Sequence, residues 1–355
     1  MPLTVGGAAP RLIALATAVP RFDLDQHEVA DRAASLFAPT EGGFHRLAPI
    51  YRNALIERRH ACVPLEWFLE SHDFAERNTL FLAHATDLLA EAAIKALAEA
   101  DLGAGDIDTI VTVCTSGIAT PSLDARLMER LPFRSDVQRL PVFGLGCAGG
   151  VLGLSRAAAM AQAAPGSHVL LLVVELCTLT FRPKDRSKSN IVATALFGDG
   201  AAAALVTCAS DDPAAPRLGP WGEHTWPASL DVMGWDVAPD GLKVVFSRDI
   251  PTLVRDDLRP IVDRFLARND MTLSDIDEFV CHPGGAKVID ALEDCFELRR
   301  GDLVHARGTL RDHGNMSAAT VLFVLRAALD ARQGGRRLMT TLGPGFTAAM
   351  MVLDT

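Results

Sequence analysis

The segment around Cys147 constrains the fold of this chain more than any other part of the sequence. A glycine-flanked cysteine, in the run GLGCAGG, lies between the apolar segment LPVFGL and the alanine-rich segment CAGGVLGLSRAAAMAQAA. The first segment predicts the end of a buried strand and the second predicts a helix, so Cys147 is expected where a strand passes into a helix N-terminus. Free N–H groups and the helix dipole stabilise a thiolate there, and such settings can lower a cysteine pKa to roughly 3.5–7.5. An isolated cysteine in a tight turn is more often buried and inert, so its neighbours decide between the two interpretations.

Two further polar residues occupy similar junctions downstream. His282 follows the short apolar segment DIDEFVC and precedes a predicted amphipathic helix from Ala286, while Asn315 directly precedes the helix SAATVLFVLRAALDA. Junctions of this kind can converge at one edge of a sheet. A Cys and His pair is typical of nucleophilic acyl chemistry, because the imidazole can hold the thiolate and polarise a carbonyl. The asparagine amide adds an uncharged donor, although taken alone His282 would more often be structural and Asn315 a helix N-cap.

The composition bounds the class of protein. The chain has 355 residues, of which 49% are hydrophobic and 22% charged, which is enough for a large core and more than one average domain. The longest apolar run, HVLLLVVELCTLTF, is interrupted by Glu175 and is too short to span a bilayer, so no membrane span is predicted. Residues 1–20 show no basic region followed by an apolar core and a cleavage site, and we therefore expect a cytoplasmic location.

Charge and cysteine spacing argue against several other classes. The seven cysteines form no CxxC and no Cys/His cluster at ligand spacing, so neither a disulfide framework nor a metal site is predicted. The net charge of −10 and the single tyrosine argue against nucleic-acid binding. The sequence has no G-x-x-x-x-G-K-[ST] phosphate loop and no well-placed G-x-G-x-x-G, so no nucleotide or redox cofactor is expected.

Predicted helices alternate with short branched-apolar runs along the chain. The first half includes the helix NTLFLAHATDLLAEAAIKALAEADL, and the second includes the helix IPTLVRDDLRPIVDRFLARND and the strand EFVCH. A passage rich in Pro, Gly and Trp, from about Asp211 to Gly241, separates them. Two successive α/β halves of similar plan predict an internal duplication, with sheets layered between helices. The predicted domains are residues 1–210, which carry the cysteine, and residues 211–355, which carry the histidine and the asparagine.

Five motifs together resemble one family. GLGCAGG, ALFGDGAAAAL, CHPGG, HGNMSAATVLF and LGPGFTAAMMVL are similar, in this order, to motifs of the type III polyketide synthases, the chalcone synthase-like family, from about Arg46 to Leu353. The resemblance implies an α/β thiolase fold with a duplicated, five-layered α-β-α-β-α architecture, and a homodimer. The ketoacyl synthase III enzymes of fatty acid synthesis share the Cys, His and Asn arrangement. They usually carry a HQAN-type motif where this chain has HPGG, and they are the alternative.

The resemblance also implies a reaction. Cys147 takes the acyl chain from an acyl-CoA, and His282 and Asn315 donate hydrogen bonds to malonyl-CoA, stabilising the enolate that decarboxylation leaves. Repeated condensation and cyclisation then give an alkylpyrone or alkylresorcinol, as in bacterial members of the family, with acyl-CoA and malonyl-CoA as substrates and no metal or other cofactor. A chalcone synthase-like enzyme with another small starter, or a scaffold that keeps the fold without the activity, are further alternatives.

Other positions match the family's substrate cavity. Phe197 matches a phenylalanine at the mouth of the active site, whereas Val244 stands where the family shows a second phenylalanine. The smaller side chain predicts a wider mouth and a medium or long fatty acyl starter. Trp235 replaces a small residue of the plant enzymes, which indicates a reshaped cavity. The remaining matched cavity-lining positions are Thr115, Cys177, Thr180 and Ser317.

Coenzyme A requires a local basic patch on this acidic protein. The segment FHRLAPIYRNALIERRH offers four arginines, among which Arg46 matches a CoA-contacting lysine of the family and Arg52 lies close to it. Gly284 and Gly285 of the HPGG motif are expected to let the pantetheine arm pass close to the backbone. We therefore predict that these four residues bind CoA.

Overall fold

Strands from both halves of the chain meet in one mixed sheet. The computed structural model describes residues 9–37, 48–246 and 250–355. Nine strands of the described chain form this sheet: β1 (Arg11–Ala18), β4 (Thr109–Cys114), β5 (Gln138–Phe143), β6 (His168–Leu176), β7 (Asp199–Thr207), β8 (Arg217–Thr225), β11 (Glu278–Cys281), β12 (Arg336–Gly343) and β13 (Thr347–Asp354). Their order is β11-β12-β13-β8-β1-β7-β6-β4-β5. Each half thus contributes one contiguous block, and the blocks join where β1 meets β8.

Two small ribbons and a set of helices complete the described chain. The two-stranded ribbons pair β2 (Phe22–Asp25) with β3 (Arg58–Ala61) and β9 (Met233–Ala238) with β10 (Gly241–Phe246). The α-helices are α1 (Gln26–Phe37), α3 (Pro49–Asn53), α4 (Phe74–Glu99), α5 (Leu123–Leu127), α6 (Gly149–Ala163), α7 (Lys188–Leu196), α8 (Ile250–Leu253), α9 (Arg259–Ala267), α10 (Ala286–Cys295), α11 (Val304–His313) and α12 (Thr320–Asp330). The single turns are η1 (Leu65–Leu69), η2 (Ala104–Asp106), η3 (Gly146–Ala148), η4 (Cys177–Thr180), η6 (Leu273–Asp275) and η7 (Ser317–Ala319), and η5 (Val254–Leu258) is a π-helical segment.

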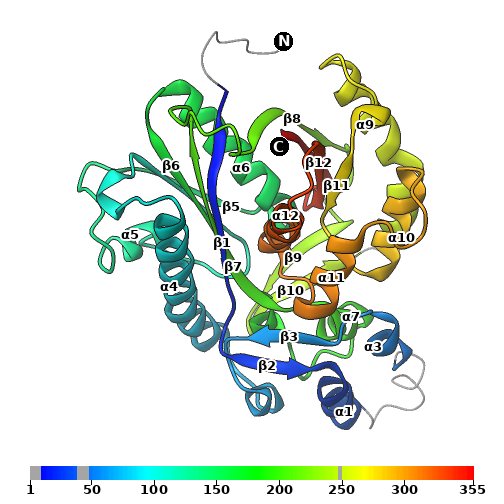
Figure 1. Cartoon of the computed structure of the whole chain (residues 1–355). Helices are drawn as coiled ribbons and strands as arrows, with labels where there is room; N and C mark the ends of the chain where they lie inside the picture. Colours follow the sequence, from blue (N-terminus) through cyan, green and yellow to red (C-terminus); the bar gives the residue numbers. More distant parts are fainter. Residues whose placement is uncertain (1–8, 38–47, 247–249) are drawn as a thin grey trace.

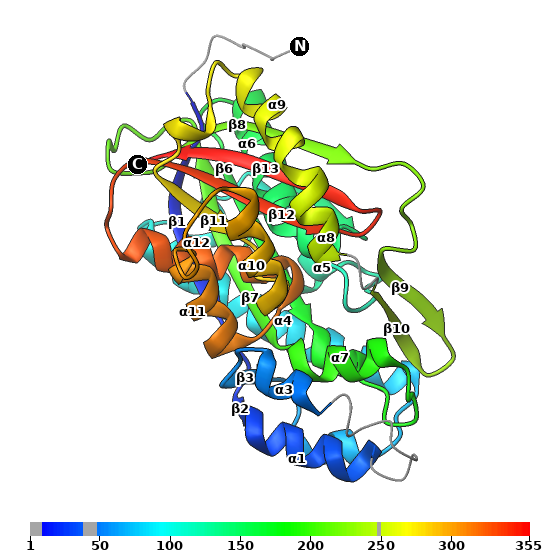
Figure 2. The same ribbon diagram turned by 90° about the vertical axis from the view of Figure 1, so that its right-hand side faces the viewer.

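The helices and the two blocks of strands are layered. α6 and α12 lie in the middle and contact strands of both blocks, α4 covers the outer face of the first block, and α9 and α10 lie at the far side of the second (Figure 1). Figure 2, turned by 90°, shows the β9-β10 ribbon projecting beside α7. The order helix, sheet, helix, sheet, helix is the predicted thiolase-type α/β architecture, which is confirmed.

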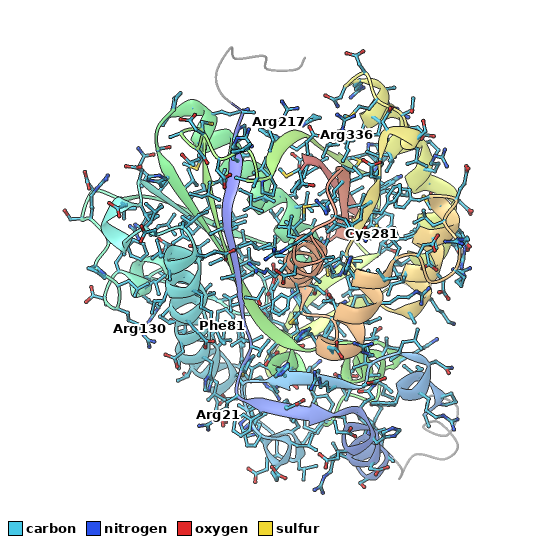
Figure 3. The ribbon with its side chains drawn as sticks, viewed as in Figure 1. Arg21, Phe81, Arg130, Arg217, Cys281 and Arg336 are labelled. Carbon is cyan, nitrogen blue, oxygen red and sulfur yellow. The ribbon has the colours of Figure 1, made fainter. Side chains whose placement is uncertain are left out.

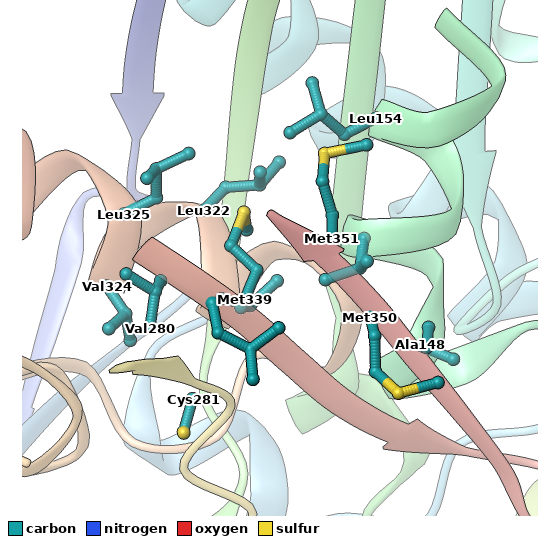
Figure 4. Close-up of a cluster of buried hydrophobic side chains, with 14 of the residues drawn as sticks. Ala148, Leu154, Val280, Cys281, Leu322, Val324, Leu325, Met339, Met350 and Met351 are labelled. Atoms are coloured by element: carbon teal, nitrogen blue, oxygen red, sulfur yellow. The ribbon is translucent and has the colours of Figure 1, made fainter. Parts of the chain in front are cut away.

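The middle layer is packed with apolar side chains. Met339 of β12 and Met351 of β13 are cross-strand partners with no exposed surface, and they lie near Leu322 of α12 and Leu154 of α6 (Figure 4). α6 is rich in alanine and glycine, so its small side chains let strands approach closely on both sides. Charged side chains such as Arg130 and Arg217 stay at the outside, while Cys281, at the end of β11, lies in the interior (Figure 3).

Two segments differ from the predicted pattern. The passage rich in Pro, Gly and Trp contains β8 and β9, because β8 pairs with β13 from Arg217 to Thr225 and long-range pairing outweighs local composition. The single helix predicted over IPTLVRDDLRPIVDRFLARND is divided into α8, η5 and α9. Pro260 has no N–H to donate and its ring would collide with the carbonyl four residues earlier, so the helix widens ahead of it. Among the helices that the structure describes, none has the length and apolar character to cross a membrane.

Candidate active site

The turn that carries Cys147 lies between β5 and α6. Cys147 is the middle residue of η3, and this turn ends directly before the first residue of α6, so the cysteine lies between a strand and a helix N-terminus as the sequence predicted. Gly146 has a φ of +47°, and a Cβ there would lie 2.5 Å from the ring of Pro344, so this position requires glycine. The Thr115 hydroxyl oxygen accepts the Gly146 N–H at 3.0 Å, and the Thr341 hydroxyl donates to the Cys147 carbonyl at 2.8 Å. These two bonds fix the turn from opposite sides.

His282 is held by the same strand that holds the cysteine turn. Its backbone N–H donates to the carbonyl of Thr340 at 2.9 Å, and Thr341, the next residue of β12, binds Cys147. The imidazole is 5% exposed, and neither ring nitrogen has a hydrogen-bond partner among the described residues. A buried imidazole without a partner is costly unless a ligand supplies one. This side chain is therefore available to a substrate.

Asn315 is positioned by two sets of hydrogen bonds. Its backbone N–H donates to Leu196 at 2.8 Å and its carbonyl accepts from Gly198 at 3.0 Å, so it brackets Phe197 of the ALFGDG motif. In its side chain, Oδ1 accepts the Ser317 N–H at 2.8 Å and Nδ2 donates to the Gly284 carbonyl at 3.2 Å. The Ser317 bond sets the orientation of the amide. One of the two Nδ2 hydrogens remains for a ligand.

Cys147, His282 and Asn315 line one cavity of about 630 Å³, here called the entrance cavity. Gly284 and Gly285 also line it, directly beside His282. The structure thus brings together residues that lie up to 168 positions apart in the sequence, from Cys147 to Asn315. Their catalytic roles stay predictions that follow from this arrangement.

Burial controls the protonation of the pair. Burial raises the pKa of the Cys147 thiol to about 12. The hydrogen bond with the Ser317 hydroxyl acts against this shift, and the charge of Glu175 adds to it. Burial also lowers the pKa of His282 to about 4. Although the Cys147 side chain is partly accessible, the surface that it shows lines the entrance cavity, so desolvation dominates. The helix-terminus argument predicted a lowered cysteine pKa and was wrong in direction, because it left out burial. Both shifts favour the neutral form, a thiol at Cys147 and an uncharged imidazole at His282.

A buried polar group lies behind the nucleophile. Glu175 accepts the N–H groups of Thr115 and Ser116 at 3.0 and 2.9 Å and the Ser116 hydroxyl at 2.6 Å. Burial raises the pKa of Glu175 to about 7. The Cys147 thiol lies 3.7 Å from the Ser317 hydroxyl.

Thr115 was predicted to line the cavity, but it lies behind the Cys147 turn with its hydroxyl turned to Gly146.

A second, much smaller pocket, here called the inner pocket, also borders Cys147. This inner pocket has a volume of about 30 Å³, and its walls include Phe197, Trp235, Val244 and Ser317. The sequence analysis did not single out Phe246, which lines both this pocket and the entrance cavity. Residues two apart on a strand share a face, so the alternation of Val244 and Phe246 along β10 is the signal that could have found it. The aromatic ring at 246 offsets the widening expected from Val244.

A narrow apolar pocket lies on the other side of Phe197. Cys177 and Thr180 line it, as does Phe197 itself, and its volume is about 50 Å³. The Thr180 hydroxyl donates to the Cys177 carbonyl at 2.7 Å, so its methyl group is left for the pocket wall. This apolar pocket extends to Leu24, Val29, Leu36, Leu65, Phe68 and Phe181.

The predicted basic patch is only partly brought to the site. Arg46 lies outside the described residues, and Arg52 is exposed on α3 without lining the entrance cavity. Arg59, from the same segment, is buried, and its guanidinium donates to the carbonyls of Thr194 and Phe197 at 2.7 and 3.0 Å. Burial lowers the pKa of Arg59 to about 10. It therefore braces the chain around Phe197 rather than binding CoA.

Two lysines that the sequence analysis missed lie at the entrance cavity. Lys188, the first residue of α7, and Lys287, in the first turn of α10, are both exposed and both line it. Of the described residues that line this cavity, none is acidic, and neither lysine forms an ion pair within the described chain. Lys287 follows the HPGG motif by two residues, which is the signal that could have found it. In the described ranges, no group of three or more His, Cys, Asp or Glu side chains could hold a metal ion.

Comparisons with known proteins agree with this geometry. The family models for the N-terminal and C-terminal domains of chalcone and stilbene synthases match residues 5–211 and 223–355. The chain is 37% identical over 359 residues to the 1,3,6,8-tetrahydroxynaphthalene synthase of Streptomyces peucetius subsp. caesius, covering 99% of this chain and 94% of that protein. It is 30% identical over 351 residues to the 3,5-dihydroxyphenylacetyl-CoA synthase of Streptomyces toyocaensis, covering 95% and 88%.

The fold of this chain also matches a solved structure closely. The crystal structure of 1,3,6,8-tetrahydroxynaphthalene synthase from Streptomyces coelicolor A3(2), a bacterial type III polyketide synthase, superposes with a TM-score of 0.92. The sequences are 28% identical, and the match covers 97% of this chain and 99% of that one.

Proposed function

Because this chain belongs to the chalcone and stilbene synthase family, the type III polyketide synthases, we propose that it loads a fatty acyl starter on Cys147 and extends it with malonyl-CoA. The family consists of acyl-transferring condensing enzymes that act on CoA thioesters without a further cofactor. The product that we propose is an alkylpyrone or alkylresorcinol. Membership in this family favours iterative condensation over the single condensation of a ketoacyl synthase III.

The observation that carries the assignment is the unpartnered imidazole of His282 in the cavity that Cys147 also lines. In the loading step, the thiol proton passes to His282 as sulfur attacks the thioester carbonyl of the acyl-CoA. The tetrahedral intermediate then expels coenzyme A, whose thiolate takes the proton back. Since burial disfavours both charged forms, proton transfer coupled to attack avoids an isolated thiolate in the cavity.

In the condensation step, His282 and Asn315 act on malonyl-CoA. Loss of carbon dioxide leaves an electron pair on the α-carbon, and the developing negative charge lies on the thioester oxygen. An imidazole N–H and the free Nδ2 hydrogen of Asn315 stabilise that oxygen. The carbanion attacks the acyl-Cys147 carbonyl, the Cys147 sulfur leaves, and the lengthened chain is now a CoA thioester that can be reloaded. No charged donor is required, because both groups donate when neutral.

The fatty acyl starter is supported by the apolar pocket beyond Phe197. Most of the described residues that line it are aliphatic or aromatic, and the exceptions are Arg32, Arg59, Cys177 and three threonines. Each methylene that leaves water contributes about 0.8 kcal/mol before the entropy of ordering the chain is subtracted. A pocket of about 50 Å³ is narrow, so it suits an unbranched chain better than a ring.

A second candidate is a fused or single aromatic product built from a small starter. The names of the two curated relatives describe such products. In this chain, the inner pocket of about 30 Å³ and the bulk of Trp235 favour a small starter, since neither leaves room for a large group beside Cys147. The two candidates share every catalytic step and differ only in the starter.

One experiment separates these candidates. The purified protein is incubated with malonyl-CoA alone and with acyl-CoA starters from acetyl to palmitoyl, plus coumaroyl-CoA, and product masses are read. We expect medium or long fatty acyl starters to be preferred and their products to retain the alkyl chain. A product formed from malonyl-CoA alone at the same rate, with no alkylated product, would support the small-starter candidate.

We further propose a homodimer in the cytoplasm, with the domain boundary at residues 210–211. β5 is the outermost strand of the sheet, and Phe143 at its end is 58% exposed, so a second copy pairing with this edge would cover it. The seven cysteines are all free, as suits a reducing compartment. Phe143→Lys is expected to give a monomer in light scattering. A variant that remains as large as the wild type would contradict the β5 interface.

A further inference from the structure

Asp199, the first residue of β7, is a buried carboxylate that joins three elements. It has no exposed surface, and it follows Phe197 of the ALFGDG motif by two residues. Its Oδ1 accepts the Thr178 N–H at 2.8 Å. Its Oδ2 accepts the Cys62 N–H at 3.0 Å and the Thr178 hydroxyl at 2.6 Å. Asp199 thus ties the start of β7 to η4 and to the residue that directly follows β3.

Arg59 of β3 makes the reverse connection. Its guanidinium donates to the carbonyls of Thr194 and Phe197 at 2.7 and 3.0 Å, while the Asp199 side chain reaches back to the backbone of Cys62. Each of the two segments therefore sends one side chain to the backbone of the other, and we call this arrangement the reciprocal clamp. It fixes residues 194–199 against β3 from both ends.

Asn315 is held against this clamped segment by backbone alone. It forms an isolated β-bridge with Phe197. A Cβ at Gly198 would lie 2.2 Å from the carbonyl oxygen of His313, and a Cβ at Gly314 would lie 2.8 Å from a carbonyl oxygen of the clamped segment. Since no side chain separates the two backbones, a shift of residues 194–199 carries Asn315 with it.

The placement of Asn315 matters because only one of its amide hydrogens is free. The other Nδ2 hydrogen donates to the Gly284 carbonyl at 3.2 Å. A displacement of about 1 Å at a reacting centre can cost on the order of 100-fold in rate. Asp199 is absent from the described residues that line the entrance cavity, the inner pocket and the apolar pocket, so any effect of Asp199 on the reaction is indirect.

We propose that Asp199 is a positioning residue for Asn315, and that the reciprocal clamp sets the direction in which Asn315 offers its free Nδ2 hydrogen to malonyl-CoA. The inference rests on the proposed role of Asn315 in decarboxylation. Asp199 acts on this step through Asn315, and acylation of Cys147 does not depend on it.

Asp199→Asn removes the carboxylate at nearly constant volume. An amide has one acceptor oxygen and one donor group, whereas all three bonds to Asp199 come from donors. In either orientation the new NH₂ group meets a backbone N–H, that of Cys62 or that of Thr178. The substitution therefore loosens the clamp on one side.

The matched control is Glu293→Gln. Glu293 is also a carboxylate without exposed surface, and it accepts the N–H groups of Gly301 and Leu303 at 3.0 and 3.3 Å. It lines none of the three pockets. The control therefore reports the general cost of replacing a buried carboxylate by an amide.

Both substitutions are made in the wild type and in Asn315→Ala. The rate of carbon dioxide release gives kcat and KM for malonyl-CoA decarboxylation, and intact-protein mass gives the rate of Cys147 acylation. Acetyl-CoA serves as the acyl donor, because it carries no alkyl chain that could enter the apolar pocket that η4 lines. Thermal unfolding checks that each variant is folded.

We expect Asp199→Asn to lower kcat for decarboxylation by about 10- to 100-fold, with KM and the acylation rate within about 2-fold of wild type. In the Asn315→Ala background the same substitution should cost less than about 2-fold more, because the donor that Asp199 positions is already gone. Glu293→Gln should change kcat by less than about 2-fold in both backgrounds.

A second variant covers the case in which Asp199→Asn does not fold. Thr178→Val removes only the hydroxyl that donates to Asp199 and leaves both backbone N–H bonds in place. It should lower kcat for decarboxylation by about 5-fold, the equivalent of one hydrogen bond, and again only where Asn315 is present.

Several outcomes overturn the positioning role. A wild-type kcat in folded Asp199→Asn, or in Thr178→Val where Asp199→Asn is unfolded, contradicts it. Equal losses with and without Asn315, or a parallel loss of Cys147 acylation, show that Asp199 serves the fold in general. An Asn315→Ala variant that decarboxylates malonyl-CoA like wild type overturns the proposed function itself, so the two failures can be told apart.

Discussion

The two spaces on either side of Cys147 differ in volume, polarity and origin. The entrance cavity has about 630 Å³, two lysines and the polar groups of His282 and Asn315, whereas the inner pocket has about 30 Å³ and a mainly apolar, aromatic wall. His282 directly follows β11 and Asn315 lies between α11 and η7, whereas the aromatic wall comes largely from the separate β9-β10 ribbon. The candidate catalytic residues therefore lie beside the main sheet, while the aromatic wall of the inner pocket lies on a ribbon outside it.

This division explains how one reaction can serve different products. Changes on the ribbon alter volume without disturbing the bonds from Thr340 and Thr341 that hold His282 and the Cys147 turn. Changes at the sheet ends are expected to affect every product equally. The predictions below test this difference, beginning with the entrance side.

The largest expected effect is the loss of a donor at the entrance side. His282→Ala or Asn315→Ala should lower malonyl-CoA decarboxylation by about 100- to 1000-fold, since each removes one hydrogen bond to the developing enolate oxygen. Acylation of Cys147 should suffer less in Asn315→Ala than in His282→Ala, because only the imidazole can take the thiol proton. Carbon dioxide release and intact-protein mass measure the two steps. Equal losses of both steps in both variants would indicate structural collapse.

A ring added to the inner wall should change selectivity and leave the chemistry intact. Val244→Phe places a phenyl group in a pocket of about 30 Å³, so the preference for long over short starters should fall by about 10-fold or more. Malonyl-CoA decarboxylation should not change. Val245→Phe puts the same ring on the opposite face of β10 and is the matched control. If starter competition gives the same profile for wild type and Val244→Phe, the inner wall does not set the starter.

Lys188 and Lys287 test whether positive charge at the entrance cavity binds CoA. Lys188→Ala and Lys287→Ala should each raise the KM for malonyl-CoA by about 5-fold with little change in kcat, because an exposed charge pair contributes up to about 1 kcal/mol. The effect should shrink at high salt. Lys184→Ala is the control, since Lys184 is exposed in the same segment and lies outside the entrance cavity. A change in kcat with KM unaltered would contradict a role in CoA binding.

The last expected effect is on stability and not on activity, and it concerns a histidine near Asn315. His313 stacks on His60 at 5.4 Å, and burial, together with the charge of His60, lowers the pKa of His313 to about 4. The unfolded chain takes up this proton near pH 6.5 and the folded chain only near pH 4, so wild type loses stability over that window as pH falls. His313→Gln removes this proton uptake.

The measurement is a pair of urea unfolding series between pH 7 and pH 4. The free energy of unfolding of wild type minus that of His313→Gln should fall as pH decreases. Glu175 and Asp199, whose pKa values are raised by burial, act in the opposite sense but cancel in this difference. A difference that stays constant with pH would show that His313 is not held neutral.

The sequence predicted the sheet-end residues better than the cavity walls. Cys147 and His282 each follow a strand and precede a helix, and local pattern reveals such junctions, whereas Asn315, predicted at a similar junction, follows helix α11 instead. Thr115 was misplaced because the direction of a side chain depends on partners far along the chain, here Gly146. Desolvation of Cys147 was also missed, since burial is a property of the assembled layers.

The positions of the side chains on the β9-β10 ribbon were also hard to predict, because they depend on strand pairing. Phe246 faces Phe197 only because β10 pairs with β9 in one register and the ribbon is folded against α7. A shift of one residue would turn Val245 inward instead. Strand alternation narrows the choice to two faces, but it cannot say which face meets the active site.

The most direct test of the central claim is the mass of the protein after exposure to an acyl-CoA. Wild type incubated with a long-chain acyl-CoA and no malonyl-CoA should gain the mass of one acyl group, and peptide mapping should place it on Cys147. Cys147→Ala should gain none, although its circular dichroism and melting temperature should match those of the wild type, because the change is small and lies in a turn. An adduct that persists on Cys147→Ala, at Cys114 or Cys177 for example, would contradict the assignment of Cys147 as the residue that carries the chain.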